Sequence, residues 1–594
     1  MVTPRFAFAA KLSDLRASGC LSAQVDGHTL VLFLYGDRVY AVDNRCPHMG
    51  FPLDRGTVKD GILTCHWHHA RFDLATGGAF DLWADDVRVF PVELRGDEVW
   101  VDLTPSADPH AHRRRLRDGL ERNLSLVIAK AAIGLLNESG DAAEPFRTGL
   151  EFGTRYRQAG WGPGLTMHTC FMNLMPYLAA DDRPRALYHG LAAVADDAAG
   201  APPRFTVQPL PGTTSDLPTL KRWFRRFVEV RDAEGAERCL VSAVRAGADD
   251  KQLADMLFAA ATDHRYIQTG HALDFTNKAL EALDRVGWDD RPMVELALSS
   301  LVSGYANADR AEESNAWRNP HDLVEILEAA FEELAALGGR GTNAGQASTA
   351  PRESDLVPIL LGDDPQAIAD VLLAALREGM APARLAGVVA YAAALRIAHF
   401  HTSNEFGDWD TALHTFTFAN AVHQGLRRTP SPDLVRGIFD AAMSVYLDRF
   451  LNVPAAKLPE PQSERNAPAA LLNELPTLLN RQQQVDAAGE LVARYLFGGG
   501  EPAGLLAMLG KLLLREDRDF HTIQCVEAAF RQFTLTAETQ GASTSDKSVA
   551  GVSREYFLVA AARYLAAHAP TMRAQGQTYT IAYRLSRGER LFEA

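Results

Sequence analysis

The sequence has few cysteines, and they do not form the pattern of a disulfide-stabilised protein. Only six cysteines occur among 594 residues, and Cys20, Cys170, Cys239 and Cys525 are scattered through unrelated stretches. Small secreted domains rely instead on dense, paired cysteines. We therefore expect a reducing compartment, which predicts a cytoplasmic protein.

Long apolar segments and basic regions are also missing. A membrane-spanning helix needs about 18 consecutive apolar residues, and no run in the sequence approaches this length. The apolar stretch at 6–10 is too short for a signal peptide. The 60 basic residues are outnumbered by 75 acidic ones, which gives a net charge of -15. This balance argues against nucleic acid or an anionic membrane as partner. No Gly-x-Gly-x-x-Gly fingerprint opens a βαβ unit, which argues against a flavin-using monooxygenase.

Composition and periodicity divide the chain into two parts. Up to about Leu103, short strand-like runs alternate with turn signals, which predicts a small all-β sandwich over residues 1–103. Residues 104–114 contain two prolines and predict a linker. Beyond them, Ala- and Leu-rich stretches recur at helical period, which predicts a large all-α helical-repeat domain over residues 115–594. A chain of this length is expected to hold several domains.

Two cysteine and histidine pairs stand close together in the all-β part. The first is Cys46 and His48, and the second, after sixteen intervening residues, is Cys65 and His68. In a Rieske [2Fe-2S] cluster two thiolates bind one iron and two imidazoles bind the other. We therefore assign the two cysteines to one iron and the two histidines to the other. Zinc is the alternative, although zinc sites seldom continue as Phe-Asp-Leu-x-Thr-Gly, the sequence at 72–77.

The stretch resembles the Rieske ferredoxin family, in Cys-Pro-His-Met-Gly at 46–50 and Cys-His-Trp-His-His at 65–69. The family usually has glycine where this chain has His69. High-potential members carry two further cysteines, and hydroxyl groups where Ala70 and Phe72 stand here. Fewer hydrogen bonds to the cluster sulfurs predict a low potential, as in a ferredoxin or an oxygenase donor.

The helical part contains an internal repeat with about four degenerate copies. Each copy predicts a helix, a glycine break, a second helix, and then a histidine that opens a further helix. These histidines are His168, His271, His414 and His521. If the copies close around a common axis, the four imidazoles converge on one metal ion, for which redox-active iron suits a Rieske cluster. The histidines helped to align the copies, so a helical solenoid with a capping histidine in each copy is the alternative.

Two further side chains share a helical face with His271. Asp274 follows it by three residues, so both side chains could reach one ion, and we predict a catalytic role for Asp274. Lys278 follows it by seven residues. We expect this lysine at the surface, with its aliphatic stem covering apolar side chains.

The helical part, residues 115–594, also resembles the questin oxidase-like family. The closest stretches are Gly-His-Ala-Leu-Asp-Phe at 270–275 and Leu-His-Thr-Phe-Thr-Phe-Ala-Asn-Ala at 413–421. The resemblance implies oxygenation of polycyclic aromatic substrates at a histidine-rich non-haem iron. The family has lysine three residues after the last histidine, where this chain has Gln524, so a modified lysine as ligand is in question.

These features predict a Rieske-type non-haem iron oxygenase. A reductase or ferredoxin would reduce the cluster, which would deliver electrons to a mononuclear Fe(II) where O2 is activated and an organic substrate oxidised. The Asp-x-x-His-x-x-x-x-His stretch of ordinary Rieske oxygenases is missing, since Asp263, His264 and His271 have the wrong spacing. The alternative is an electron-transfer or redox-sensing protein whose helical repeats bind a protein partner. A homo-oligomer, with electron transfer between chains, is left open.

Overall fold

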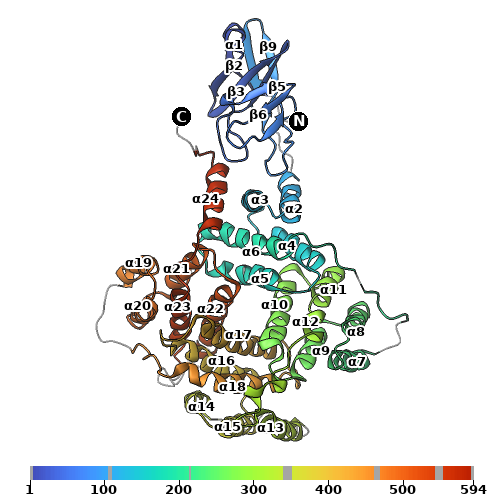
Figure 1. Ribbon diagram of the computed structural model, residues 1–594, viewed down its shortest axis with the longest axis vertical. Helices are drawn as coiled ribbons and strands as arrows, with labels where there is room; N and C mark the ends of the chain where they lie inside the picture. The colour runs from blue at the N-terminus through green and yellow to red at the C-terminus, as the bar shows by residue number, and fades with distance from the viewer. Residues whose placement is uncertain are drawn as a thin grey trace. The chain divides into compact units, whose positions relative to one another are not determined.

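The computed structural model describes residues 5–104, 110–205, 207–212, 216–338, 351–460, 468–541, 553–589 and 591. It forms two compact units, one of Met1–Pro145 with Ala574–Ala594 and one of Phe146–Arg573. The strands all lie within residues 6–102 and a large helical region follows, which confirms the predicted fold class (Figure 1). Residues 105–109 of the predicted linker lie outside the described residues. The domain boundaries predicted from the sequence remain a prediction.

Three antiparallel sheets form the all-β part of the first unit. Their strand orders are β1-β10-β9, β2-β3-β4-β8 and β5-β6-β7. The strands are β1 (Phe6–Lys11), β2 (Cys20–Val25), β3 (His28–Tyr35), β4 (Arg38–Asp43), β5 (Thr57–Lys59), β6 (Ile62–Thr64), β7 (Arg71–Asp73), β8 (Val89–Phe90), β9 (Val92–Arg95) and β10 (Glu98–Asp102), with a short helix α1 (Leu12–Ser18) after β1.

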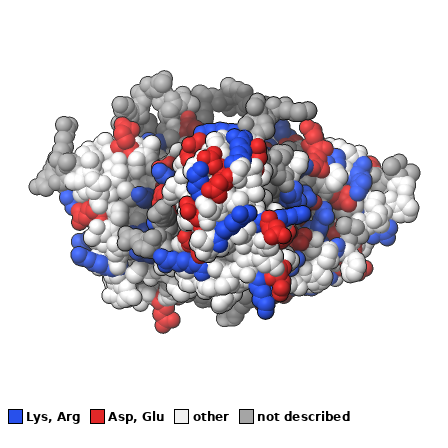
Figure 2. All heavy atoms as spheres, turned by 90° about the horizontal axis from the view of Figure 1, so that it is seen from above, with Lys and Arg blue, Asp and Glu red and all other residues white. Residues whose placement is uncertain are grey.

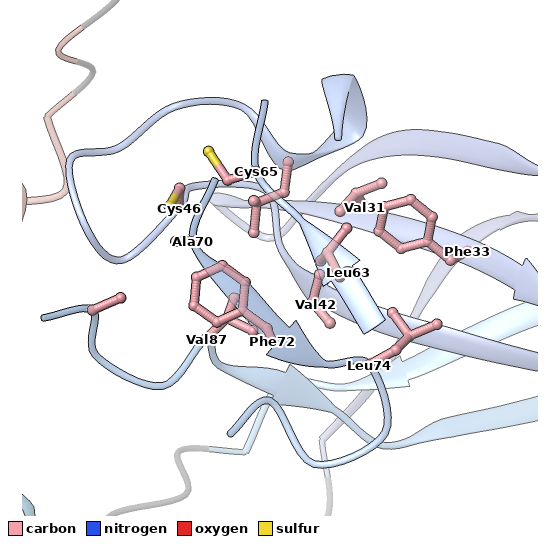
Figure 3. Close-up of a cluster of buried hydrophobic side chains, with 12 residues drawn as sticks. Val31, Phe33, Val42, Cys46, Leu63, Cys65, Ala70, Phe72, Leu74 and Val87 are labelled. Carbon is pink, nitrogen blue, oxygen red and sulfur yellow. The ribbon is translucent and has the colours of Figure 1, made fainter. Parts of the chain in front are cut away.

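Strand β3 is apolar because it is covered on both faces. Leu30 and Leu32 pack into one hydrophobic cluster, whereas Val31 packs into another. Successive side chains of a strand point to opposite faces, so a strand between two clusters needs apolar residues at every position. The cluster around Val31 also contains Cys46 and Cys65, whose sulfur atoms lie together at one end of it in Figure 3.

Helices complete the first unit. They are α2 (Ala111–Glu121), α3 (Ser125–Ser139) and α24 (Ala574–Ser586), and α3 packs against both of the others. Helix α4 (Ala143–Tyr156) begins in the first unit and continues into the second. The sheets and segments from both ends of the chain therefore share one compact body.

The described residues of the second unit are helical. After α4, its helices are α5 (Pro163–Leu174), α6 (Arg183–Asp197), α7 (Leu217–Glu229), α8 (Ala233–Arg245), α9 (Asp250–Thr262), α10 (His271–Val286), α11 (Arg291–Ser299), α12 (Val302–Ala306), α13 (Leu323–Gly338), α14 (Glu353–Leu360), α15 (Pro365–Arg377), α16 (Pro382–Ala398), α17 (Phe406–Arg428), α18 (Arg436–Leu447), α19 (Pro468–Leu478), α20 (Val485–Phe497), α21 (Pro502–Leu514), α22 (Phe520–Gly541) and α23 (Glu555–Ala567). Proline begins α5, α15, α16 and α21, where its missing N–H costs no helical hydrogen bond.

Four of these helices form a closed ring at the centre of the second unit. Helix α10 packs against α5 and α17, and α22 also packs against α5 and α17. Each helix carries one of the four repeat histidines. His271 begins α10 and His521 is the second residue of α22, but His168 and His414 lie inside their helices. The expectation that a histidine opens each helix is therefore wrong for these two.

The described helices and the face seen in Figure 2 bear on binding to membranes and nucleic acids. None of the described helices has both the length and the apolarity needed to cross a bilayer. On the described part of the face seen in Figure 2, basic and acidic side chains are interspersed. A continuous basic area, as nucleic-acid binding requires, is not visible there.

Candidate metal centres

The two cysteine and histidine pairs predicted to bind the cluster lie on neighbouring loops of the first unit. Cys46 follows β4 and Cys65 follows β6, and both side chains are buried. The His48 and His68 rings lie 4.8 Å apart between centroids, nearly perpendicular at 85°. The loops are held by backbone hydrogen bonds, from Cys46 N to the Phe51 carbonyl at 2.8 Å and from Cys65 N to the Ala70 carbonyl at 2.9 Å. The structure thus brings all four side chains together.

A hydrogen bond between the two thiols shifts their pKa values in opposite directions. A hydrogen bond from Cys46, together with the backbone amides of Trp67 and His68, lowers the pKa of Cys65 to about 6. The same thiol–thiolate hydrogen bond, followed by burial, raises the pKa of Cys46. Thiolate is the form that binds metal, so Cys65 is electrostatically prepared to act as a ligand.

His48 is held as a neutral imidazole. Burial, followed by the charges of Lys130 and His68, lowers the pKa of His48 to about 4. The Trp83 ring packs edge-on against it, with 4.6 Å between ring centroids. Its Nδ1 is buried and has no hydrogen-bond partner. An orphaned nitrogen on a neutral ring is the form that binds a metal ion.

The structure explains why His69 is unusual for its position. Its φ is 62°, in the left-handed region, and its side chain is exposed. Glycine adopts this conformation without a steric penalty, whereas a residue with a Cβ costs roughly 1–3 kcal/mol. The family preference for glycine therefore follows from the backbone of the loop.

In the second unit, three of the four repeat histidines meet. One ligand nitrogen from each of His271, His414 and His521 lies within 4.8 Å of the other two. The Nε2 atoms of His414 and His521 are 3.1 Å apart. Two nitrogens bound at right angles to one ion at about 2.1 Å would be about 3.0 Å apart. This pair is therefore spaced like two ligands of a single ion.

Burial keeps two of these imidazoles, those of His271 and His414, in the metal-binding form. It lowers the pKa of His271 to about 3, with help from the other two histidines, and that of His414 to about 4, with help from His521. The turn before His271 is strained, since Gln268 and Thr269 have φ of 53° and 51°. Such backbone costs of order 1–3 kcal/mol per residue concentrate at functional sites.

His168 does not belong to this group, so the expected four imidazoles are reduced to three. Its Nε2 bonds the Phe146 carbonyl at 3.0 Å, and its ring lies against Gly149 of α4 and Gly190 of α6. Five residues later on α5, Asn173 faces the ring of helices and contacts α10 and α22. Five residues correspond to about 140° around a helix. His168 therefore points out of the ring, towards α4 and α6.

Asp274 lies within the ring of helices but outside the three-histidine group. Its Oδ2 accepts a hydrogen bond from Gln524 Nε2, and its Oδ1 is buried without a partner. Burial raises the pKa of Asp274 to about 7, against the opposing charge of Lys278. Asp274 follows His271 by three positions and Gln524 follows His521 by three, so equivalent positions of two repeat copies are hydrogen-bonded to each other.

Lys278 is buried, and its predicted surface position is wrong. Its side chain is 1% exposed, and its Nζ lies 3.0 Å from Glu281 and 2.6 Å from Glu527. Asn173 donates to both carboxylates, at 2.7 and 3.0 Å. Buried charges are tolerated when they are paired and hydrogen-bonded in this way. The ring of helices therefore encloses a charged network along α10.

Asp410 lies next to one of the histidines and was missed from the sequence. Its Oδ2 lies 3.7 Å from Nδ1 of His521, while its Oδ1 accepts a 2.6 Å hydrogen bond from Tyr564. A carboxylate near one ring nitrogen leaves the other nitrogen directed at the metal. Asp410 precedes His414 by four residues on α17, so helical spacing could have suggested it.

A cavity of about 380 Å³ lies against α17, the helix that carries His414, although none of the three histidines lines it. Thr411 and Thr415, which flank His414 on α17, form part of its wall. Much of the remaining lining is aromatic or aliphatic, contributed by Tyr266, Leu323, Tyr446, Leu447, Phe450 and Leu451. Asp448 also lines it, and burial raises the pKa of this carboxyl to about 7. A mainly apolar cavity with a few polar groups is typical of small-molecule sites.

Comparison with known proteins identifies the N-terminal part. A family model described as Rieske [2Fe-2S] domain matches residues 6–91. The 3-phenylpropionate/cinnamic acid dioxygenase ferredoxin subunit of Shigella boydii serotype 4 (strain Sb227) is 35% identical over 82 residues, which cover 14% of this chain and 76% of that protein. The chain belongs to the Rieske [2Fe-2S] domain family.

Two further relatives of the Rieske domain are also named as ferredoxins of dioxygenases. The subunit of the same name from Escherichia coli (strain K12) is also 35% identical over 82 residues, again 14% of this chain and 76% of that protein. A solved ferredoxin of carbazole 1,9a-dioxygenase from Nocardioides aromaticivorans IC177 is 32% identical, covering 17% of this chain and 98% of its own, with a TM-score of 0.16.

A Rieske domain implies a [2Fe-2S] cluster, and the donors in this structure fit one. Two buried thiols are hydrogen-bonded to each other, and two neighbouring imidazoles include one with an orphaned nitrogen. Two sulfurs and two nitrogens are the donor set of this cluster type. Relatives named as dioxygenase ferredoxin subunits support a redox role for the Rieske domain.

Proposed function

We propose that this chain is an iron-dependent oxygenase with its own electron-transfer domain. Cys46, Cys65, His48 and His68 hold the cluster in the Rieske domain. A mononuclear iron is held by the three-histidine group. The observation that supports this best is the short distance between the ligand nitrogens of the three histidines. Iron bound there supplies the activation of O2.

The residues around the three-histidine group prepare it for this role. Asp410 orients His521 through Nδ1, and Tyr564 fixes Asp410 by donating to its other oxygen. Burial raises the pKa of Asp274 to about 7, so this carboxyl is partly protonated at neutral pH. We place that proton on Oδ1, because Oδ2 already accepts from Gln524. Oxygen reduction consumes protons, and Asp274 can donate one within the ring of helices.

The cavity beside His414 is the proposed substrate site. Its aromatic and aliphatic walls suit an apolar organic molecule, and its volume of about 380 Å³ suits several fused rings. The questin oxidase-like resemblance of residues 115–594 points to the same class, polycyclic aromatics. Asp448 Oδ2 is buried without a partner and could bond an oxygen of the substrate.

The proposal requires an external electron donor, a reductase or a ferredoxin. The relatives of the Rieske domain are themselves named as ferredoxin subunits of dioxygenases. Six free cysteines suit the reducing environment in which we place the protein, the cytoplasm. A homo-oligomer remains compatible with this scheme.

The second candidate is an electron-transfer or redox-sensing protein. It is favoured by the ferredoxin relatives of the Rieske domain, and its helical unit would bind a protein partner. This alternative has iron in the cluster alone and does not depend on the three histidines.

Metal content separates the two functions. Iron and acid-labile sulfide are measured on anaerobically purified chain and on a His271→Ala, His414→Ala double variant. The oxygenase has about three irons per two sulfides, falling to about two in the variant while the cluster spectrum is unchanged. Two irons in both proteins would overturn the proposed iron site and leave the electron-transfer function.

A further inference from the structure

A lysine from the helical part of the first unit contacts the loop that carries His48. Nζ of Lys130, on α3, donates to the carbonyl oxygen of Pro47 and, at 3.0 Å, to that of His48. It also lies 2.9 Å from Asp85 Oδ2. The Lys130 side chain is 15% exposed, so water screens its charge only partly. A mostly buried cation thus lies on the backbone of a cluster ligand.

Asp85 joins this lysine to an arginine on a second helix. Arg115, on α2, lies 2.7 Å from Asp85 Oδ1 and also donates to the carbonyl oxygens of Leu82 and Ala84, both at 3.2 Å. Burial alone would raise the pKa of Asp85, but the Lys130 and Arg115 charges outweigh it and lower the pKa. Arg115 also lies 3.4 Å from Asp118, so two cations and two carboxylates together are close to neutral. Lys130 is the cation of this group that contacts the His48 loop directly.

Arg115 also fixes the residue that packs on His48. The Arg115 hydrogen bonds hold the backbone on both sides of Trp83, and the Trp83 ring lies against the His48 ring. On the other side of the loop, Gly50 has a φ of 80°, and a Cβ there would lie 3.0 Å from the Leu585 side chain of α24. Helices beyond the Rieske match at 6–91 therefore close on the cluster loops.

We propose that the positive charge of Lys130, held on the His48 loop, raises the reduction potential of the Rieske cluster. Reduction adds one electron to the cluster, and a fixed cation close by stabilises the more negative, reduced state. Lys130 therefore raises the potential above the value that the Rieske domain would have without it. This inference needs only the Rieske cluster, and it holds whether or not the helical unit binds iron.

The test compares two substitutions in the full-length chain. Lys130→Gln keeps a hydrogen-bond donor but removes the charge, whereas Lys130→Arg keeps both. The cluster is titrated with dithionite and followed through its own absorbance and EPR signal. For Lys130→Gln we expect the equilibrium constant for reduction to fall about tenfold, which for one electron is about 59 mV. For Lys130→Arg we expect the wild-type potential.

A distant lysine provides the control. Lys11 on β1 is paired with Glu98 on β10, in the sheet that does not carry the cluster loops, so Lys11→Gln should leave the potential unchanged. A wild-type potential in Lys130→Gln with full cluster content would overturn the proposal. An equal fall in Lys130→Gln and Lys130→Arg would also overturn it, because charge would then not be the cause. If Lys130→Gln fails to retain the cluster, an altered potential in Lys130→Arg decides against the proposal and a wild-type potential decides for it.

Discussion

The Rieske site and the three-histidine site are assembled by opposite means. The four Rieske donors lie on two short loops, all within residues 46–68. The three histidines come from three helices, and the first and last are 250 residues apart in the sequence. Local turns place the donors of the first site, whereas helix packing places those of the second. The geometry of the loop site should tolerate distant changes that disturb the helical site.

The two sites also differ in how their donors are made ready for metal. In the Rieske domain a hydrogen bond from Cys46 and backbone amides lower the pKa of Cys65 to about 6, and burial lowers that of His48 to about 4. In the helical unit, burial lowers the pKa of His271 to about 3. Burial therefore acts at both sites, and hydrogen bonds to a thiolate act in addition at the Rieske site.

The largest effect is expected from removing a donor of the loop site. Cys46→Ser should abolish the cluster, because serine does not supply the thiolate that the iron requires. Labile sulfide and visible absorbance should disappear, while about one iron per chain remains in the helical unit. Cys20→Ser is the control, since Cys20 lies on β2 outside the ligand loops and should leave the cluster intact. Loss of all iron from Cys46→Ser would contradict the independence of the two sites.

Desolvation in the ring of helices should appear as a pH dependence of stability. The pKa of Asp274 is raised to about 7 by burial, so the folded state retains a proton that the unfolded state releases near pH 4. The free energy of unfolding should therefore fall as pH rises between these values, by about 2–3 kcal/mol from pH 5 to pH 8. In metal-free Asp274→Asn this contribution disappears, as urea unfolding followed by circular dichroism would show.

An exposed carboxylate serves as the reference for that measurement. Asp355 on α14 is exposed, and Asp355→Asn should keep the wild-type pH dependence. Identical pH profiles for the wild type and Asp274→Asn would show that Asp274 is already ionised at pH 5.

The carboxylate that orients His521 should affect metal affinity. Asp410→Asn removes the charge near Nδ1, and we expect the helical unit to bind iron about 10–100-fold more weakly. Competition with a chelator measures this affinity in a chain whose cluster is intact. Asp370→Asn, on the exposed surface of α15, is the control. An unchanged affinity in Asp410→Asn would show that helix packing alone orients the ring.

The smallest effect on metal is expected at the fourth repeat histidine. His168→Leu should leave the iron content unchanged, because this ring bonds the Phe146 carbonyl outside the three-histidine group. The substitution removes one hydrogen bond to that buried helical carbonyl, which should cost roughly 0.5–1.5 kcal/mol of stability. Loss of the helical iron in this variant, with a normal unfolding curve, would restore His168 as a ligand.

The Rieske site and the fold class could be predicted from local signals in the sequence. The two cysteine and histidine pairs and the change from strand to helix patterning near Leu103 are properties of short segments. Asp410 was also within reach, because it lies four residues before His414.

Other features depend on contacts that no local pattern contains. From the sequence, Lys278 is expected at the surface. In the structure it pairs with Glu527, 249 residues away, inside the ring of helices. The direction of His168 is decided by two glycines on neighbouring helices, which leave room for its ring. Lys130 has no sequence signal at all, since its role depends on how α3 meets the His48 loop.

The packing of α3 against α24 has a consequence for the order in which the protein is made. Helix α24 follows α3 by more than 400 residues, and the whole second unit is translated between them. At 5–20 residues per second, a ribosome needs roughly 20–90 s for that stretch. During this interval the cluster loops lack the support of α24 at Gly50. Stable cluster insertion should therefore be a late event in biosynthesis, after α24 has been made.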